Sequence, residues 1–337
     1  MPRMKKTAKK IIGLVLSVLF LWLALRKVDW ERVPAVLSAV DWRVLPLMIV
    51  SVTIEYLLRT IRWRYILHPR TIPFGHLYGG LILGYMFNNL FPARAGEFVR
   101  AWYLGRKGHA SFSEAFGSVV MERLLDGICV VSFIAFAVTS FPVSTAVRSG
   151  GYTAVAFYGA VLFVILLLQF RRNWIDPVSD LLLSPFPTAW RDRIYGLRDS
   201  FIGGLSLVRH PKPLWTAIFL SVVAWAASVG TNYISMRMFN LPIGLDGSLL
   251  LIAVLSLGAM IPSSPGMIGI YEYCCIIVLT DMLGLPREVA VAFGLATHFL
   301  TYAYVIIIGL AILTLENLHL ADLETAAASE ETEPADA

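Results

Sequence analysis

Long apolar runs separated by short polar segments are the dominant pattern of this 337-residue chain. The runs cover residues 11–25, 44–58, 77–91, 115–140, 152–170, 214–238, 248–261, 270–285 and 288–314. A helix that crosses a bilayer needs about 20 mainly apolar residues, within a range of about 17–25. The pattern therefore predicts an all-α polytopic membrane protein.

Two interruptions with the pattern Pro-x-x-x-Gly lie beside the shortest runs. The first extends from Pro92 to Gly96 and the second from Pro262 to Gly266, 170 residues later. Helix breakers at membrane depth are tolerated only where the freed backbone is buried in protein or lines a wet cavity. One such break in each half of the chain predicts a substrate site near the middle of the membrane.

The charges between the runs distinguish two topologies. In the first, 77–104 and 248–285 are re-entrant helical hairpins and about six full spans remain, which places the basic loops 59–70, 105–107 and 171–213 in the cytoplasm. In the alternative eight-span topology, 77–91 crosses completely and several of these basic loops are exported. The positive-inside rule favours the hairpins.

The hairpin topology has the layout of an inverted-topology repeat, because the two hairpins enter from opposite sides. We expect a first repeat at 1–140 and a second at 141–315, the latter with a cytoplasmic insertion at 171–213 that reads either as an amphipathic surface helix or as a small solvated hairpin. Residues 316–337 are acidic and predict a disordered cytoplasmic tail. Basic residues before the uncleaved first span place the N-terminus in the cytoplasm as well, in a bacterial or archaeal cytoplasmic membrane.

Composition agrees with this setting, since 57% of the residues are hydrophobic and 15% are charged, with a mean hydropathy of +0.70. The excess of Lys and Arg lies in loops between apolar runs, so we do not expect nucleic acid as a partner. The three cysteines, Cys129, Cys274 and Cys275, lie in apolar segments and predict reduced packing residues. No spacing typical of a metal or cofactor site is present.

Charges that fall at membrane depth are the first candidate site residues. They are Arg94, Glu97, Arg100, Glu122, Arg123 and Asp126. A charge inside a span costs about 2.5–3.5 kcal/mol on insertion scales, so such charges normally pair and mark a pathway. Arg123 and Asp126 are spaced to pair locally, and Glu122 is left to meet Arg94 or Arg100.

This group has a structural interpretation, an ion-pair network that pins the first hairpin, and a functional one. In the functional interpretation Arg94 captures a phosphate, since a guanidinium offers a planar fork of donors. Gly96 lets a head group approach the N-terminal end of a half-helix. The carboxylates Glu97 and Glu122 hold that arginine, bind a cationic head group or carry a proton. Asn89, with Asn88, is expected to cap or bridge the broken helix.

The second hairpin and the last span supply the remaining candidates. Ser263, Ser264 and Gly266 offer hydroxyls and open backbone, and Glu272 follows in the returning half-helix. His298 lies in the last run, where a single histidine is either a packing residue or a titrating group. We include all five in the predicted substrate site.

Three blocks of the chain resemble the hallmark motifs of the lysylphosphatidylglycerol synthase transmembrane, or flippase-like, family. They are Asn89–Glu97 with Arg100, Met121–Asp126 and Ile261–Glu272. The resemblance covers about residues 10–315 and implies an inner-membrane protein that moves lipids between leaflets. Some relatives carry a soluble aminoacyl transferase domain, and nothing in this chain resembles one. Where many relatives carry Arg in the last span, this chain has His298.

From these features we expect a lipid translocase rather than an enzyme, with membrane lipids as its partners. Its substrate would be a phospholipid or a lipid-linked phosphate head group, passed through a polar cavity between the hairpins. Two alternatives stay open. One is a non-catalytic membrane partner of a glycosyltransferase or lipid-modifying enzyme, and the other is an intramembrane lipid phosphatase or transferase using the serines and His298.

Overall fold

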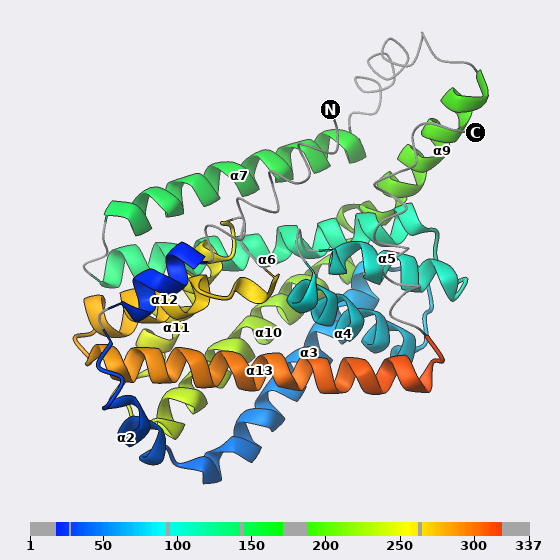
Figure 1. Cartoon of the computed structure of the whole chain (residues 1–337). Helices are drawn as coiled ribbons and strands as arrows, with labels where there is room; N and C mark the ends of the chain where they lie inside the picture. Colours follow the sequence, from blue (N-terminus) through cyan, green and yellow to red (C-terminus); the bar gives the residue numbers. More distant parts are fainter. Residues whose placement is uncertain are drawn as a thin grey trace, which may run out of the picture.

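The computed structural model describes residues 18–26, 28–91, 95–141, 145–170, 188–261 and 265–318, with the backbone alone at 146, 188, 189 and 193. Every regular element in these ranges is a helix, as the sequence predicts (Figure 1). After a helix at 18–25, the elements are α2 (Val33–Ser38), η1 (Trp42–Val44), α3 (Leu45–Ile66), α4 (Phe74–Leu90), α5 (Gly96–Arg106), α6 (Phe112–Ser140), α7 (Thr145–Phe170), α9 (Thr188–Gly204), η3 (Ser206–Arg209), α10 (Pro211–Met238), α11 (Leu245–Gly258), η4 (Pro265–Met267), α12 (Ile270–Ile276), the π-helical η5 (Ile277–Met282) and α13 (Arg287–Leu315).

Five segments of the described residues are long and apolar enough to cross a bilayer. They are Trp42–Ile66, Val147–Phe170, Pro211–Met238, Pro265–Met282 and Arg287–Leu315. The fourth is interrupted by left-handed backbone at Gly266 (φ 67°) and Gly269 (φ 88°), so its regular helix begins at Ile270. The chain is thus a multi-pass membrane protein, while the predicted count of six spans and two re-entrant hairpins stays a prediction.

Local sequence signals mark where the helices begin. Proline occupies the first turn of α3 and α10 and the residue before α4 and α13, positions where its missing N–H costs no helical hydrogen bond. The Ser111 hydroxyl accepts the N–H of Glu114 at 3.2 Å and caps α6. These signals act within a few residues, which is why the helix positions follow so closely from the sequence.

Helices α4 and α5 form a tight helical hairpin. At the open end of this hairpin, His76 in the first turn of α4 contacts His109 in the loop after α5. Nδ1 of His76 lies 2.6 Å from Nε2 of His109. Near the break, a Cβ added to Gly96 would lie 1.8 Å from the carbonyl oxygen of Gly84. Only glycine permits this approach, since any side chain would push the two backbones apart.

Helices α11 and α12 form the second helical hairpin. A Cβ on Gly258 would lie 2.6 Å from the thiol of Cys274, and one on Gly247 would lie 3.3 Å from Leu283, so both ends of the hairpin are closely packed. Figure 1 shows the two hairpins beside α13 at its opposite ends. The broken ends of both therefore point toward the middle of the molecule.

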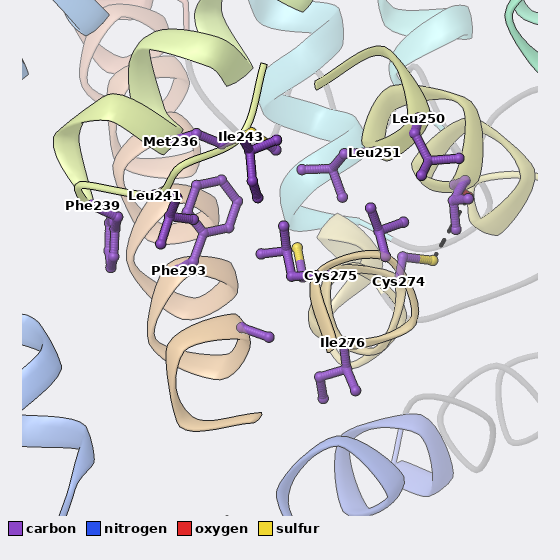
Figure 2. Packing of buried hydrophobic residues seen from close by; sticks show 14 of the residues in the cluster. Met236, Phe239, Leu241, Ile243, Leu250, Leu251, Cys274, Cys275, Ile276 and Phe293 are labelled. Atoms are coloured by element: carbon purple, nitrogen blue, oxygen red, sulfur yellow. Dashed lines mark hydrogen bonds between the residues drawn. The ribbon is translucent and has the colours of Figure 1, made fainter. Parts of the chain in front are cut away.

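The buried apolar residues form two clusters, one around each hairpin. In the cluster of the second hairpin, Figure 2 shows Cys274 and Cys275 among Leu250, Leu251 and Phe293. Both cysteines are buried thiols, and that of Cys274 donates to the backbone at 3.7 Å. The expectation of apolar packing is confirmed for Cys274 and Cys275, whereas Cys129 is half-buried.

Contacts between loops show which chain segments share an end of the molecule. At one end the loops after α3 and α5 and the end of α13 are joined by the pairs Arg70–Glu114 and Lys107–Glu316. At the other end, Arg287 donates to the carbonyls of Leu23 and Ala24, and Asn240 donates to that of Ala39. The start of α4 and the end of α5 therefore lie at the same end of the molecule, and whether these helices cross the membrane stays a prediction.

Two sequence-based boundaries change in the structure. The sequence predicts a cytoplasmic loop at 59–70, whereas α3 continues to Ile66. Arg59 and Arg62 are therefore part of this helix, and their side chains are buried in the protein. Within 171–213 the helices α9 and η3 occupy residues 188–209, and a Cβ on Gly204 would lie 2.1 Å from the Glu114 carbonyl oxygen of α6. Residues 171–187 and 319–337, including most of the predicted tail, lie outside the described residues.

Candidate functional site

The break in the first hairpin is held by a polar cap. The side-chain oxygen of Asn88 accepts the backbone N–H of Gly96 at 3.0 Å, which satisfies one of the free N–H groups at the start of α5. The expectation that Asn88 caps the broken helix is confirmed. Arg94, the predicted phosphate contact, lies outside the described residues, as does Pro92.

Beside this break lies a group of eight charged side chains, which we call the charged cluster. It comprises Glu55, Arg59, Arg62, Glu97, Arg100, Glu122, Arg123 and Asp126, from helices α3, α5 and α6. Four guanidinium groups face four carboxylates, so the formal charge of the cluster is zero. Such neutrality limits the cost of burying so many charges side by side.

Glu122 is the centre of the charged cluster and is fully buried. Arg100 donates to both of its oxygens, at 3.0 and 2.8 Å. Arg62 lies 3.2 Å from Oε1 and Arg123 lies 2.6 Å from it. The predicted pairing of Glu122 with an arginine of the hairpin is therefore confirmed for Arg100, and this fork-to-fork contact joins α5 to α6.

Asp126, one turn further along α6, joins the cluster to α3 and α10. Arg62 donates to its Oδ1 at 2.5 Å and the indole N–H of Trp225 donates at 3.0 Å. Arg59 lies 3.7 Å from the same oxygen. Arg123 lies 3.5 Å from Oδ2, which confirms the predicted local pair between Arg123 and Asp126. Three guanidiniums thus surround this carboxylate.

One side of the charged cluster is open. The side chain of Arg123 is 36% exposed, whereas those of Arg62 and Glu122 are 0% exposed. Arg123 meets Glu97 only loosely, with 3.8 Å between Nε and Oε1. Among the described residues, neither Arg123 Nε nor Glu97 Oε2 has a hydrogen-bond partner. This pair, next to the helix break, is the part of the cluster best placed to receive a further ligand.

The second hairpin contributes a carboxylate with two partners. Oε1 of Glu272 lies 2.7 Å from Nδ1 of His298, and Oε2 accepts the backbone N–H of Gly269 at 2.7 Å. The ring of Tyr271 stacks on the imidazole, with 4.3 Å between ring centroids. Glu272 and His298, two predicted site residues 26 positions apart, are thus brought together, and Glu272 caps the first turn of α12.

Tyr302 joins the two breaks. Its hydroxyl donates to the backbone carbonyl of Asn89 in the last turn of α4, at 2.5 Å. Its ring covers the left-handed Gly266, where an added Cβ would lie 2.5 Å from the ring and 3.3 Å from the Asn89 oxygen. The predicted residues Asn89 and Gly266 are therefore neighbours, while Ser263 and Ser264 lie outside the described residues.

The sequence predicts Glu55 and Arg59 as an interfacial pair at the inner end of a span, and this pair forms at 2.9 Å. The prediction leaves Arg59 and Arg62 out of the candidate site, because the apolar run ends where the first arginine appears. A signal was present, since Glu55, Arg59 and Arg62 are spaced four and three residues apart and so share one helix face. On the facing helix α10, Ser221 and Ser228 accept from these arginines at 3.2 Å. Small hydroxyl residues on α10 thus complete the buried polar face.

A polar cavity of about 500 Å³ lies apart from the charged cluster, between the loop after α3, the start of α6 and the end of α9. His68, Arg70 and Glu114 line it. Within the described ranges, no group of three or more His, Cys, Asp or Glu side chains has an arrangement that suits a metal ion. The contacts that the charged cluster itself forms are ion pairs and hydrogen bonds.

Comparison with known proteins places this arrangement in a family. The model of the lysylphosphatidylglycerol synthase TM region matches residues 10–309. The glycosyltransferase AglD of Haloferax volcanii is 26% identical, over 95% of this chain and 56% of AglD. A UPF0104 membrane protein of Pyrococcus horikoshii is 24% identical, over 94% of this chain and 98% of the relative. Another, from Methanothermobacter thermautotrophicus, is 25% identical, over 78% of this chain and 83% of the relative. The chain thus spans little more than half of AglD.

Proposed function

Because this chain belongs to the lysylphosphatidylglycerol synthase transmembrane family, we propose that it is a lipid translocase rather than an enzyme. Its substrate is a phospholipid or a lipid-linked phosphate, whose head group crosses between leaflets through the region where the two helix breaks meet. The acyl chains stay in the bilayer. One hairpin repeat rocks against the other to expose the site alternately to each side.

The observation that carries this proposal is the charged cluster beside the break of α4 and α5. Four buried or half-buried arginines at membrane depth are costly to maintain, and their carboxylate partners only offset that cost. A packed apolar interface would hold α3, α5 and α6 together without any charge that could be left buried and unpaired. A head group that carries a phosphate is a ligand for which guanidinium groups at this depth are useful.

Within the cluster, Arg123 is the proposed phosphate contact among the described residues, together with Arg94 as predicted from the sequence. Arg123 is exposed on one side, and its 3.8 Å contact with Glu97 is loose enough for a phosphate to replace that carboxylate. Both Nη groups of Arg100 are engaged with Glu122. In this proposal Glu122 orients the guanidiniums around it, and Arg123 binds the ligand.

The loop contacts support the topology that we propose. The Lys107–Glu316 and Arg70–Glu114 pairs gather one set of loops at one end of the molecule. These loops are rich in arginine and lysine, so that end faces the cytoplasm of a bacterial or archaeal cell. The α4–α5 hairpin then enters from the cytoplasm and the α11–α12 hairpin from outside, as an inverted repeat requires.

A lipid-flip assay in proteoliposomes tests the function. The purified protein is reconstituted with NBD-labelled phosphatidylglycerol, phosphatidylethanolamine or polyprenyl phosphate, and dithionite reports the label that reaches the outer leaflet. We expect Arg123→Gln to slow transport at least about tenfold, the effect of losing roughly 1.4 kcal/mol of charge-assisted binding. Arg70→Gln, which removes an exposed arginine from an equally well-formed ion pair, is the matched control.

Two results would contradict the proposal. If the wild-type protein moves none of the three labelled lipids, the translocase assignment fails. If transport proceeds at the wild-type rate in both Arg123→Gln and the double variant Arg94→Ala, Glu122→Gln, the protein moves lipid by another site, and the charged cluster is only a structural network.

The similarity to AglD favours a second candidate. Because AglD is named a glycosyltransferase and this chain matches 56% of it, a region of this kind accompanies a glycosyltransferase in at least that protein. The chain would then be a non-catalytic membrane partner of such an enzyme. Co-purification with a glycosyltransferase, combined with no lipid movement in the flip assay, would favour this function over translocation.

A further inference from the structure

We infer that the Glu272–His298 pair is a proton-binding site that couples proton movement to lipid transport. This inference rests on the proposed translocase function and adds its coupling ion. Glu272 has Oε1 at 2.7 Å from the His298 imidazole and is buried. A carboxylate with a neutral imidazole carries one negative charge, and uptake of one proton from water gives a neutral ion pair. Histidine is the side chain that commonly exchanges a proton near neutral pH, which makes the imidazole of His298 the group that takes up this proton in our proposal.

The packing around the pair fixes its geometry. Gly294 lies one turn before His298 on α13, and a Cβ there would lie 3.4 Å from the Glu272 Cα. Helices α12 and α13 are thus closely packed where the carboxylate reaches the imidazole. Tyr271 stacks on the imidazole with 4.3 Å between ring centroids and holds its orientation. The close packing of α12 against α13 thus holds the two side chains of the pair together.

Among the described groups around the Glu272–His298 pair, the imidazole is the one that we infer gains and loses a positive charge. On α12 the neighbouring titratable groups are the Tyr271 hydroxyl, which contacts Thr297, and the thiols of Cys274 and Cys275. Helix α13 adds the Tyr302 hydroxyl. Helix α4 presents the Asn89 carbonyl, and α11 faces α12 through the nontitrating Gly258 and Val254. Among the described residues, His298 is the only basic partner of Glu272 within 4.0 Å.

The pair is connected to both helix breaks, which gives a route for coupling. The second carboxylate oxygen of Glu272 holds the N–H of the left-handed Gly269 at 2.7 Å, so a change of charge on the pair acts on the cap of α12. Tyr302, one turn after His298, holds the Asn89 carbonyl at the end of α4. Protonation of the pair therefore affects the contact between the two hairpins. This contact must change when the site is exposed alternately to each side of the membrane.

A proton also suits an anionic cargo. A negatively charged head group near the pair stabilises its protonated, neutral form, because it repels the negatively charged one. A lipid with one negative charge would then cross with one proton, and the loaded site would carry no extra charge through the membrane. The energetic reason for coupling is thus the cost of moving an uncompensated charge through hydrocarbon.

The first test uses proteoliposomes with NBD-phosphatidylglycerol and an imposed pH gradient. With one proton per lipid, a gradient of one pH unit drives the leaflet ratio of the label to about tenfold. Glu272→Gln and His298→Gln are expected to bring this ratio near one. The control variants are Glu288→Gln, which removes a carboxylate from α13, and His210→Gln, which removes an imidazole just before α10. Both should keep the wild-type ratio. A wild-type ratio that ignores the pH gradient, or follows a sodium gradient instead, overturns the proton site and leaves the translocase function standing.

A second test needs no transport. The titration of ¹⁵N-labelled His298 is followed by NMR in nanodiscs of phosphatidylglycerol and of phosphatidylcholine, with His210 reporting the change in surface pH. We expect the midpoint of His298 to move toward higher pH in phosphatidylglycerol, by more than that of His210, and Glu272→Gln to abolish the difference. Equal shifts of the two histidines overturn the proton site. If the wild-type protein moves no lipid, the translocase proposal fails and this measurement alone decides whether the pair binds a proton in response to an anion.

Discussion

Replacing the buried Glu122–Arg100 pair tests how the charged cluster is held together. Arg100 forms two hydrogen bonds with Glu122, at 3.0 and 2.8 Å, and both side chains are buried. Arg70 makes the same two-bond contact with Glu114, at 2.9 Å for each bond, but its side chain is 52% exposed. Both pairs consist of two hydrogen bonds between a guanidinium and a carboxylate, but Glu122 is buried and also contacts Arg62 and Arg123. Their comparison therefore tests burial together with the surrounding network.

The expected magnitudes follow from that difference. At 2.8 Å and an effective dielectric constant of about 20, two unit charges attract by about 6 kcal/mol, much of which is offset by desolvation. Removing one partner leaves the other charge buried, so Glu122→Met or Arg100→Met should each lower the free energy of unfolding by about 3–5 kcal/mol. The exposed Arg70→Gln should lower it by less than about 1 kcal/mol.

The double variant is the decisive measurement. Arg100→Met with Glu122→Met removes both charges and keeps the cluster neutral, so it should be less destabilised than the sum of the single variants by about 0.5–3 kcal/mol. Unfolding by SDS in mixed micelles, followed by tryptophan fluorescence and circular dichroism, gives the free energies. If the two single effects add within about 0.5 kcal/mol, or if Arg70→Gln costs as much as Arg100→Met, the reasoning from burial and pairing is wrong.

Three further outcomes are expected. Gly96→Ala places a Cβ 1.8 Å from the α4 backbone and should destabilise the protein by about 1–3 kcal/mol or more, whereas Gly230→Ala, with open space around it, should cost little in the same unfolding assay. Tyr302→Phe should lower the free energy of unfolding by about 1 kcal/mol through loss of one hydrogen bond and should also slow lipid flip; an unchanged flip rate would detach this contact from transport. The hydrogen bond from Lys107 lowers the pKa of the Glu316 carboxyl, so this contact stabilises the fold above the ordinary pKa of glutamate and its contribution is lost as the pH falls through the lowered value. Lys107→Ala should therefore flatten the fall of thermal stability below about pH 4.

Much of the fold was accessible from the sequence because its signals are local. Apolar runs and prolines placed the helices, and the Pro-x-x-x-Gly segments placed the end of α4 at Leu90, the start of α5 at Gly96 and the left-handed backbone before Ile270. The i, i+3 pair of Arg123 and Asp126 was predicted for the same reason. The error at Arg59 shows the limit of this reasoning. The prediction ends a span at the first arginine because exposed arginine is costly in lipid, whereas Glu55 of the same helix and Asp126 of α6 make Arg59 tolerable inside the protein.

The partners of the site residues needed the tertiary structure. Nothing in the sequence pairs Glu272 with His298, 26 residues away, or Tyr302 with the carbonyl of Asn89 in the other half of the chain. These contacts depend on where along their lengths two helices approach each other. A small residue such as Gly294 allows a close approach but does not by itself determine its position.

The sequence by itself determined that this protein lies in the membrane, that its elements are helices and that both hairpins are broken by proline and glycine. Each of these properties is set by burial in lipid and by backbone geometry within a few residues. The tertiary structure decided which guanidinium faces which carboxylate and that the two breaks meet at Tyr302. Such pairings depend on how whole helices pack, because a buried charge is stabilised by whichever partner the fold brings within a few ångströms, regardless of its distance along the chain.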